Sequence, residues 1–223
     1  MTTATQKAYR GMGMEGSVAR WYEKTTRKDM AEFRKLADRL RVGLPQGADV
    51  LEVAPGPGFL SIELAKGGQF RVTGLDISKT FVELARKNAA GLGVKVDFRE
   101  GNASAMPFAD NSFDLIVCRA AFKNFSEPVK ALQEMHRLLR PGGTGLIVDM
   151  RRDTSMSAIS EAVNRMGAGL LNRWLIKATF RFVLIKRAYT RQEFEQMLSG
   201  IPFRKAEVRE DKQSIGLEIW MSK

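Results

Sequence analysis

The sequence predicts an α/β fold with a seven-stranded, mostly parallel sheet and helices on both of its faces. Strand-like apolar runs alternate with segments of helical spacing through the middle of the chain, which is typical of parallel sheets. The small residues of 54–58 form a tight turn between the first strand and a helix. The last two strands follow each other closely, which predicts an antiparallel hairpin. The length of 223 residues suits a single α/β domain.

The first half of the chain carries three of the expected strands. Val50, Leu51 and Val53 form the apolar run of a buried strand, and a helix follows the small-residue turn. The strands expected here span 49–54, 70–75 and 94–99. The helices expected here span 17–41, 58–66 and 78–90.

The second half repeats the alternation and then changes to a hairpin. The helix expected at 127–139 has an apolar stripe at Leu132, Met135, Leu138 and Leu139. A further helix is expected at 190–199. The strands expected here span 113–118, 143–150, 203–210 and 214–221.

The turn at 54–58 and an acidic residue eighteen positions after it indicate a nucleotide site. Asp76 ends the second strand, where a carboxylate can accept hydrogen bonds from both hydroxyls of a ribose. A dinucleotide-binding turn would need a third glycine where Phe59 stands, and Glu52 would repel a pyrophosphate. Both features favour a cofactor that has adenosine, no phosphate and positive charge, which is S-adenosylmethionine. The alternative is a strand–turn–helix unit that binds no ligand.

These motifs resemble those of the class I S-adenosylmethionine-dependent methyltransferases. The chain is most similar to the small-molecule group that includes the ubiquinone/menaquinone-biosynthesis methyltransferases. The resemblance covers residues 48–150 and is weak outside them. The matching segments are Glu52 to Gly58, Gly74-Leu75-Asp76-Ile77-Ser78 with Phe81, Gly101-Asn102-Ala103, Ser112 to Arg119, and Leu138 to Gly143.

Two positions depart from the family pattern. Ala54 replaces the first glycine of the turn, and close approach of a ligand survives there if the backbone needs no positive φ. Asn102 stands where the family has an aspartate for the adenine amine, and it keeps an acceptor oxygen. We expect cofactor binding to be retained; an inactive relative that has lost the cofactor is the alternative.

The resemblance implies a Rossmann-like, doubly wound fold in one domain, 1–223. Its parts are an N-terminal helical lid (1–47), a cofactor-binding core (48–150), a helical substrate cap inserted before the last strands (151–191), and a C-terminal helix and hairpin (192–223). Tyr22 in the lid either reaches the cofactor or substrate or packs on the domain. The cofactor-binding residues that we expect are Tyr22, Glu52, Ala54, Pro55, Gly56, Gly58, Phe59, Asp76, Ile77, Ser78, Phe81, Asn102, Ala103 and Arg119.

The acceptor side is expected after the fourth strand, at the edge of the sheet where ligands bind in such folds. Lys123 and Asn124 stand there, with Lys123 either orienting an anionic substrate or solvated in a loop. We assign no catalytic residue. Cys118 ends an apolar strand and is expected to be buried rather than nucleophilic, and His136 falls on the charged side of its helix. One histidine and one cysteine argue against a zinc site.

The positive charge of +11 lies outside the predicted core. Residues 48–150 carry no net charge, whereas 1–47 carry +5 and 151–191 carry +7. Arg173, Lys177 and Arg181 form a basic row on an amphipathic helix near 170–187, which either closes the substrate pocket or makes a weak contact with an anionic membrane. The N-terminus has no secretory signal, and a single cysteine suits a reducing compartment, so we expect a cytoplasmic protein.

We expect the chain to methylate a small acceptor of apolar or anionic character. An RNA methyltransferase is an alternative suggested by the charge, but a nucleic-acid partner is not preferred, because the Asn/Asp-Pro-Pro-Tyr/Phe motif is absent after the fourth strand. A non-catalytic cofactor-binding protein is the other alternative. The sequence does not define the methylated atom or the oligomeric state.

Overall fold

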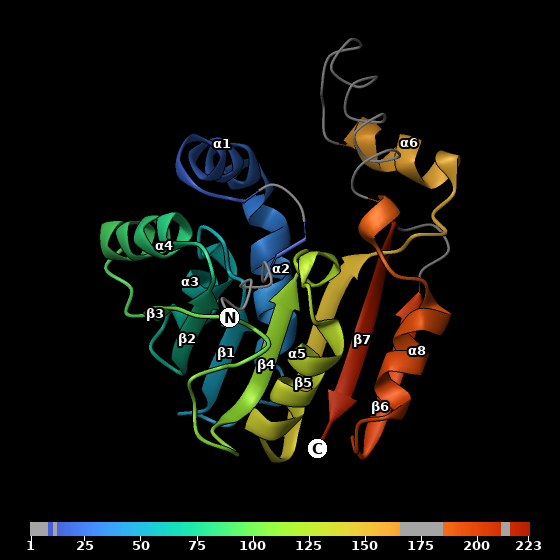
Figure 1. Cartoon of the computed structure of the whole chain (residues 1–223). Coiled ribbons are helices and arrows are strands. Elements are labelled where there is room, and N and C mark those ends of the chain that lie inside the picture. Colours follow the sequence, from blue (N-terminus) through green and yellow to red (C-terminus); the bar gives the residue numbers. More distant parts are fainter. Residues whose placement is uncertain (1–8, 11–12, 166–184, 211–214) are drawn as a thin grey trace, which may run out of the picture.

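A single sheet of seven strands forms the centre of the molecule (Figure 1). The computed structural model describes residues 9–10, 13–165, 185–210 and 215–223. The strands are ordered β3-β2-β1-β4-β5-β7-β6. Six of them run parallel to one another, and β7 runs antiparallel to these six. Their bounds are β1 Asp49–Val53, β2 Arg71–Asp76, β3 Asp97–Glu100, β4 Phe113–Arg119, β5 Leu139–Met150, β6 Lys205–Glu210 and β7 Gly216–Ser222. The predicted fold class is confirmed.

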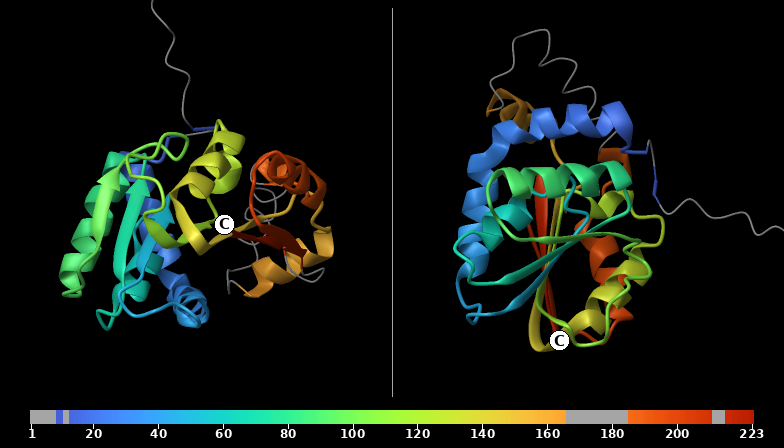
Figure 2. Two further views of the ribbon diagram at one scale, coloured as in Figure 1. Left: turned by 90° about the horizontal axis from the view of Figure 1, so that it is seen from below. Right: turned by 90° about the vertical axis from the view of Figure 1, so that its left-hand side faces the viewer.

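Helices cover both faces of the sheet. The described helices are α1 Gly16–Thr26, α2 Met30–Arg41, α3 Phe59–Ala65, α4 Lys79–Gly91, α5 Pro128–Leu138, α6 Met156–Arg165 and α8 Arg191–Ser199. Short 3-10 turns lie at η1 Arg27–Asp29, η2 Phe122–Asn124 and η4 Ile185–Arg187. Figure 2 shows α2, α3 and α4 on one side of the sheet, with α5 and α8 on the other.

The alternation of side chains along the central strands explains these two layers. Val50 and Val72 point into a core with Phe33 and Leu60 of α2 and α3. Leu51, one residue further along β1, points into the opposite core with α5 and α8. In that core α5 buries Leu132, Met135 and Leu138 of the predicted stripe together with Ala131, whereas Leu139, the fourth predicted residue, begins β5.

The fifth strand begins at Leu139 rather than at residue 143, and the sixth at Lys205 rather than at residue 203. Two further predicted boundaries were wrong for local reasons. A single helix over 17–41 is interrupted by η1, next to the point where the Thr25 hydroxyl donates to the Trp21 carbonyl and competes with the helical ladder. The third strand begins at Asp97 rather than at residue 94, because the Val94 amide donates to Ala89 and completes the end of α4.

The sheet reverses its winding between β1 and β4. The crossovers through α3 and α4 extend it toward β3, and the crossover through α5 extends it toward β5. Ligands in open α/β sheets bind outside the carboxyl ends of the strands at such a point. Helices α1 and α6 stand beyond this edge, at the top of Figure 1.

The basic amphipathic helix predicted near 170–187 lies outside the described residues except for its last three, which form η4. Among the described helices, none is both long and apolar enough to cross a lipid bilayer.

Candidate cofactor and active site

The small-residue turn follows β1 directly and winds through three left-handed positions. Ala54, Gly56 and Gly58 have φ angles of 57°, 55° and 80°. The Ala54 amide donates to the Leu75 carbonyl at 2.7 Å, which ties the turn to the end of β2. The condition that Ala54 needs no positive φ is therefore not met: the alanine takes the conformation that favours glycine.

Glycine is required at Gly58 by both conformation and packing. A Cβ atom there would lie 2.7 Å from the Phe98 ring and 2.9 Å from the Ala85 methyl. At Gly56 the nearest atoms would be those of Tyr22 and Phe81, at 3.9 and 4.0 Å. The turn is thus packed beneath Gly58 and bordered by two aromatic rings beside Gly56.

Asp76 closes the turn from the end of β2. One of its oxygens accepts the Gly56 amide at 2.9 Å, and the other accepts the Ser78 amide at 2.9 Å. Each carboxylate oxygen retains a further lone pair for a ribose hydroxyl. The residue is 5% exposed, and burial raises its pKa to about 6 against the opposing effect of these amides. Asp76 therefore shapes the turn as well as facing it.

Glu52 supports the turn from beneath. Its Oε2 accepts the amide of Ser61 at 2.8 Å and the hydroxyl of the same residue, so it fixes the first turn of α3. Burial raises the pKa of this carboxyl to about 7, and the hydrogen bonds from Ser61 and the charge of Arg119 oppose that rise. Arg119 lies at the end of β4 with its guanidinium 4.3 Å from the ring centre of Phe33.

The N-terminal segment crosses the carboxyl edge above β2 and α4. The Ser78 hydroxyl caps α4 by accepting the Phe81 amide, and it donates to the Met14 carbonyl at 2.7 Å. Tyr22 in α1 packs edge-on against Phe81, with ring centres 5.7 Å apart. The structure thus packs Tyr22 on the domain beside the glycine turn, and its contact with the cofactor stays a prediction.

The remaining predicted cofactor residues border the same edge. Asn102 already uses its side-chain oxygen to accept the Ser104 amide at 2.9 Å, which leaves one lone pair for an adenine amine. Ala103 packs against the core, and Ile77 is 39% exposed. Pro55 and Phe59 are buried under the turn.

Lys123 is neither a solvated loop residue nor a free cation. Its ammonium lies 2.8 Å from Asp149 Oδ1, and the two side chains are 5% and 1% exposed. The ammonium also donates to the Ala120 carbonyl, and the Lys123 amide donates to Asp149 Oδ2 at 2.9 Å. Asp149 was missed from the sequence; its signal was a carboxylate near the end of the apolar strand β5, the position that Asp76 has in β2.

Tyr9 and Arg10 were also missed. Tyr9 pairs with Phe125 in a single β-bridge, and the Arg10 amide donates to the Asn124 carbonyl at 2.7 Å. Burial raises the pKa of the Tyr9 hydroxyl; Arg187 opposes that rise, and Tyr22, Asp76 and Asp149 add to it. Tyr9 and Arg10, which belong to the N-terminal part of the chain, therefore lie against the loop predicted to face the acceptor.

Backbone strain marks the ends of β1 and β4. Ala54 and Ala120 are the residues just beyond these neighbouring strands, with φ angles of 57° and 58°. A left-handed alanine costs about 1–2 kcal/mol, and such strain clusters at functional sites. The strain coincides with the point where the sheet reverses its winding.

Other candidate groups lie away from this edge. Cys118 is fully buried, and burial raises the pKa of its thiol, as expected of a packing residue. His136 packs against Phe203 and contacts the Pro202 carbonyl at 3.1 Å. The described part of the chain contains no cluster of three or more His, Cys, Asp or Glu residues arranged to hold a metal ion.

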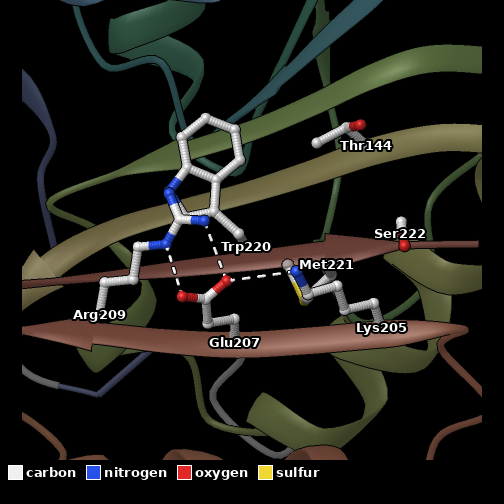
Figure 3. A pocket seen from close by; sticks show the side chains of 7 residues that line it. All are labelled: Thr144, Lys205, Glu207, Arg209, Trp220, Met221 and Ser222. Carbon is white, nitrogen blue, oxygen red and sulfur yellow. Dashed lines mark hydrogen bonds and ion pairs between the residues drawn. The ribbon is translucent and has the colours of Figure 1, made fainter.

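Two surface hollows are separate from the site. Figure 3 shows one of about 290 Å³ on β5, β7 and β6, where Arg209 lies beside Trp220 and pairs with Glu207. A larger hollow of about 1050 Å³ lies beside the start of β2, at the edge of the sheet opposite the carboxyl ends of the parallel strands.

The residues at the carboxyl edge fit S-adenosylmethionine. Gly56 presents backbone without a side chain, Asp76 retains lone pairs for two hydroxyls, and Tyr22 and Phe81 offer aromatic faces. Glu52 and Asp76 are buried carboxyls, whose ionised forms a cationic cofactor stabilises.

Comparison with known proteins agrees with this geometry. Residues 51–147 match the family model described as "Methyltransferase domain". The chain is 34% identical over 117 residues to the ubiquinone/menaquinone biosynthesis C-methyltransferase of Hahella chejuensis, covering 51% of this chain and 47% of the relative. It is 37% identical over 112 residues to the demethylmenaquinone methyltransferase of Desulfitobacterium hafniense, covering 48% and 44%. The chain thus spans about half the length of the curated relatives that it matches.

Solved structures share the fold over nearly the whole chain. A structure described as an S-adenosylmethionine-dependent methyltransferase from Methanococcus maripaludis superposes with a TM-score of 0.75 at 23% identity, covering 100% of this chain and 97% of the other. One described as a SAM-dependent methyltransferase from Aquifex aeolicus gives a TM-score of 0.69 at 22% identity, covering 92% and 96%.

Proposed function

We propose that the protein is a class I S-adenosylmethionine-dependent methyltransferase that transfers a methyl group to a small molecule. The match of residues 51–147 to a methyltransferase domain and the relatives at 34–37% identity support this proposal. The observation that carries the proposal is the left-handed turn at 54–58 with the buried carboxyl of Asp76 bonded to it. This turn lies where the sheet reverses its winding, the place for a ligand in such folds.

Each residue has a definite task in this proposal. S-adenosylmethionine, when bound, supplies an electrophilic methyl group on a good leaving group. Asp76 would accept the ribose hydroxyls, and Asn102 the adenine amine, while Phe81 and Tyr22 enclose the ligand. Glu52 keeps α3 and the turn in place and adds negative charge near the cationic end. The protein's contribution is then mainly orientation and exclusion of water.

We place the methyl acceptor against the loop after β4, which carries Lys123 and Asn124. The buried face of this loop is aromatic: Phe122 packs against Phe125 and Tyr189, with ring centres 5.3 and 5.9 Å away. These rings are buried in the core and support the loop, whose half-buried residues Ala121 and Asn124 are the ones open to an acceptor. The names of the curated relatives point to quinone precursors as the first acceptors to try.

An acceptor screen tests the function. Demethylated naphthoquinols and benzoquinols, small carboxylates and short RNAs would be incubated with the protein and cofactor, while release of S-adenosylhomocysteine is followed. We expect release with a quinol. Release with RNA alone, weakened by salt, would instead support an RNA enzyme. Tight cofactor binding with no release for any acceptor would support a non-catalytic binding protein.

A weak contact with an anionic membrane is a second proposal, and it rests on the basic sequence at 170–187. Each Lys or Arg near an anionic bilayer contributes about 1 kcal/mol, and salt screens the attraction. Sedimentation with anionic and neutral vesicles at low and high salt tests it. Equal sedimentation with both lipids at low salt would exclude the contact and leave this segment as a cover for the substrate pocket.

A further inference from the structure

The ion pair of Lys123 and Asp149 is the most buried pair of charges at the carboxyl edge among the described residues. Besides the contacts with Lys123, Asp149 Oδ1 accepts the Met150 amide at 2.7 Å. The pair therefore joins the end of β5 to η2 through its two side chains and the Lys123 amide, while the Met150 amide holds the carboxylate within β5. Buried ion pairs contribute little net stability compared with apolar residues of the same size. Stabilisation of the fold is therefore not a sufficient explanation for this pair.

The same pair fixes the strained residue at the end of β4. Ala120 has a φ angle of 58°; its amide donates to the Val148 carbonyl at 2.7 Å, and its carbonyl accepts the Lys123 ammonium. The residue is thus held on both sides, from β5 and from Lys123. Without the ammonium, an alanine there would relax toward a negative φ, and the loop would turn differently.

The loop in turn holds the N-terminal segment. The Asn124 carbonyl accepts the Arg10 amide, and Tyr9 bridges Phe125. The Arg10 side chain reaches across to the Tyr189 hydroxyl at 3.1 Å. A continuous set of contacts therefore runs from Asp149 through Lys123 and the loop to Tyr9, whose hydroxyl lies within the electrostatic reach of Asp76.

We propose that Lys123 and Asp149 are a positioning pair for methyl transfer: they hold residues 119–125 in a strained conformation, and through that loop they hold Tyr9 and Arg10 over the acceptor. The inference rests on the proposed function for its kinetic consequence only. Arg119 stays paired with Val148 in the sheet, and the N-terminal segment keeps its anchor at Ser78, so we expect cofactor affinity to be unchanged when the pair is removed.

Three variants test the role. Lys123→Met with Asp149→Leu removes both charges at similar side-chain size. Ala120→Gly added to this double variant lets the backbone keep a positive φ without the ammonium. Arg191→Met with Glu195→Leu is the matched control, an ion pair on α8 whose side chains are 50% and 51% exposed.

The double variant at 123 and 149 is expected to bind S-adenosylhomocysteine with unchanged affinity, while kcat falls at least tenfold. Hydrogen exchange at the amides of 119–125 and of Arg10 should rise at least tenfold. Ala120→Gly should return the exchange at 119–125 toward the wild-type rate and recover at least threefold in kcat. The control pair should change none of these quantities.

Three results would overturn the proposal. If the double variant kept the kcat and the hydrogen-exchange rates of the wild type, the pair would contribute only to packing. Lost kcat with unchanged exchange would mean that Lys123 acts on the substrate directly, and no recovery with Ala120→Gly would exclude the backbone as the target. If the double variant does not fold, the same comparison is made with Lys123→Gln and Asp149→Asn together, which removes both charges and keeps a polar pair. If the wild type methylates nothing, the proposed function fails, and the exchange measurements still decide the positioning role.

Discussion

At the scale of single residues, two alanines occupy positions that suit glycine. Ala54 and Ala120 both have φ angles near 60°, at the ends of neighbouring central strands. A local preference is overridden at both, by a backbone hydrogen bond in each case and by the Lys123 ammonium at the second. Strain at these two residues is thus part of the site.

Ala54→Gly should stabilise the fold by about 1 kcal/mol, because glycine adopts a positive φ without the cost that alanine carries. Ala90→Gly is the control: Ala90 is an exposed helical residue of α4, and glycine there should destabilise by about 1 kcal/mol. Urea unfolding of both variants measures the change in the free energy of unfolding, which should be positive for Ala54→Gly and negative for Ala90→Gly. A destabilised Ala54→Gly protein would mean that the turn does not need the left-handed conformation.

Buried carboxyls give the site a characteristic pH dependence. The folded protein raises the pKa of Glu52 to about 7 and that of Asp76 to about 6, so folding favours their protonated forms. The stability they contribute is fully present below the unfolded values near 4 and is lost as the pH rises through 6 and 7.

Thermal melts of wild type and Glu52→Gln between pH 4 and 8 test this dependence. Glutamine keeps an acceptor for the Ser61 amide and does not titrate. The wild-type melting temperature should fall relative to that of the variant as the pH rises, since a tenfold change in proton affinity is worth about 1.4 kcal/mol. Parallel curves for the two proteins would show that Glu52 is ionised at its ordinary pKa.

At the scale of elements, two helix caps have different duties. Ser78 caps α4 and also holds the N-terminal segment through the Met14 carbonyl. Thr190 caps α8 in a capping box with Glu193, on the face of the sheet that α5 and α8 cover. The two hydroxyls are thus matched in their local role and differ in their position relative to the site.

Ser78→Ala and Thr190→Ala should each cost about 1 kcal/mol of unfolding free energy, the usual value of an N-cap. Ser78→Ala should in addition weaken cofactor binding several-fold, because the segment over the turn loses its anchor. Denaturation and calorimetry on both variants separate the effects. Equal cofactor affinity in the two variants would show that the N-terminal segment takes no part in binding.

The elements and half of the site could be predicted from the sequence, and the other half could not. The turn at 54–58 and Asp76 could be located from residue types and spacing, although the left-handed φ of Ala54 could not be predicted from them. The partners of Asp149 and Tyr9 could not be predicted, because their contacts with Lys123 and Phe125 span 26 and 116 positions of the chain. Such pairings appear only when β4, β5 and the N-terminus are brought together.

At the scale of the whole molecule, the excess positive charge lies in segments other than those that form the sheet and the cofactor turn. Residues 48–150, which carry no net charge, form the cofactor turn and most of the sheet, and the flanking basic segments account for the net charge. Those segments meet at the carboxyl edge, where Arg10 contacts Tyr189. The flanks, rather than the core, are therefore the place to look for the choice of acceptor.

Cofactor binding measured by calorimetry tests the central claim most directly. We predict one saturable site for S-adenosylhomocysteine and at least a tenfold loss of affinity in Asp76→Ala, since each hydrogen bond to the carboxylate contributes about 1.5–3 kcal/mol. That variant also loses the acceptor for two buried amides, so circular dichroism must show that it is folded. Asp97→Ala, at a half-exposed carboxylate of β3, should bind like wild type. The account would be contradicted if the wild type showed no saturable binding, or if a folded Asp76→Ala bound with unchanged affinity.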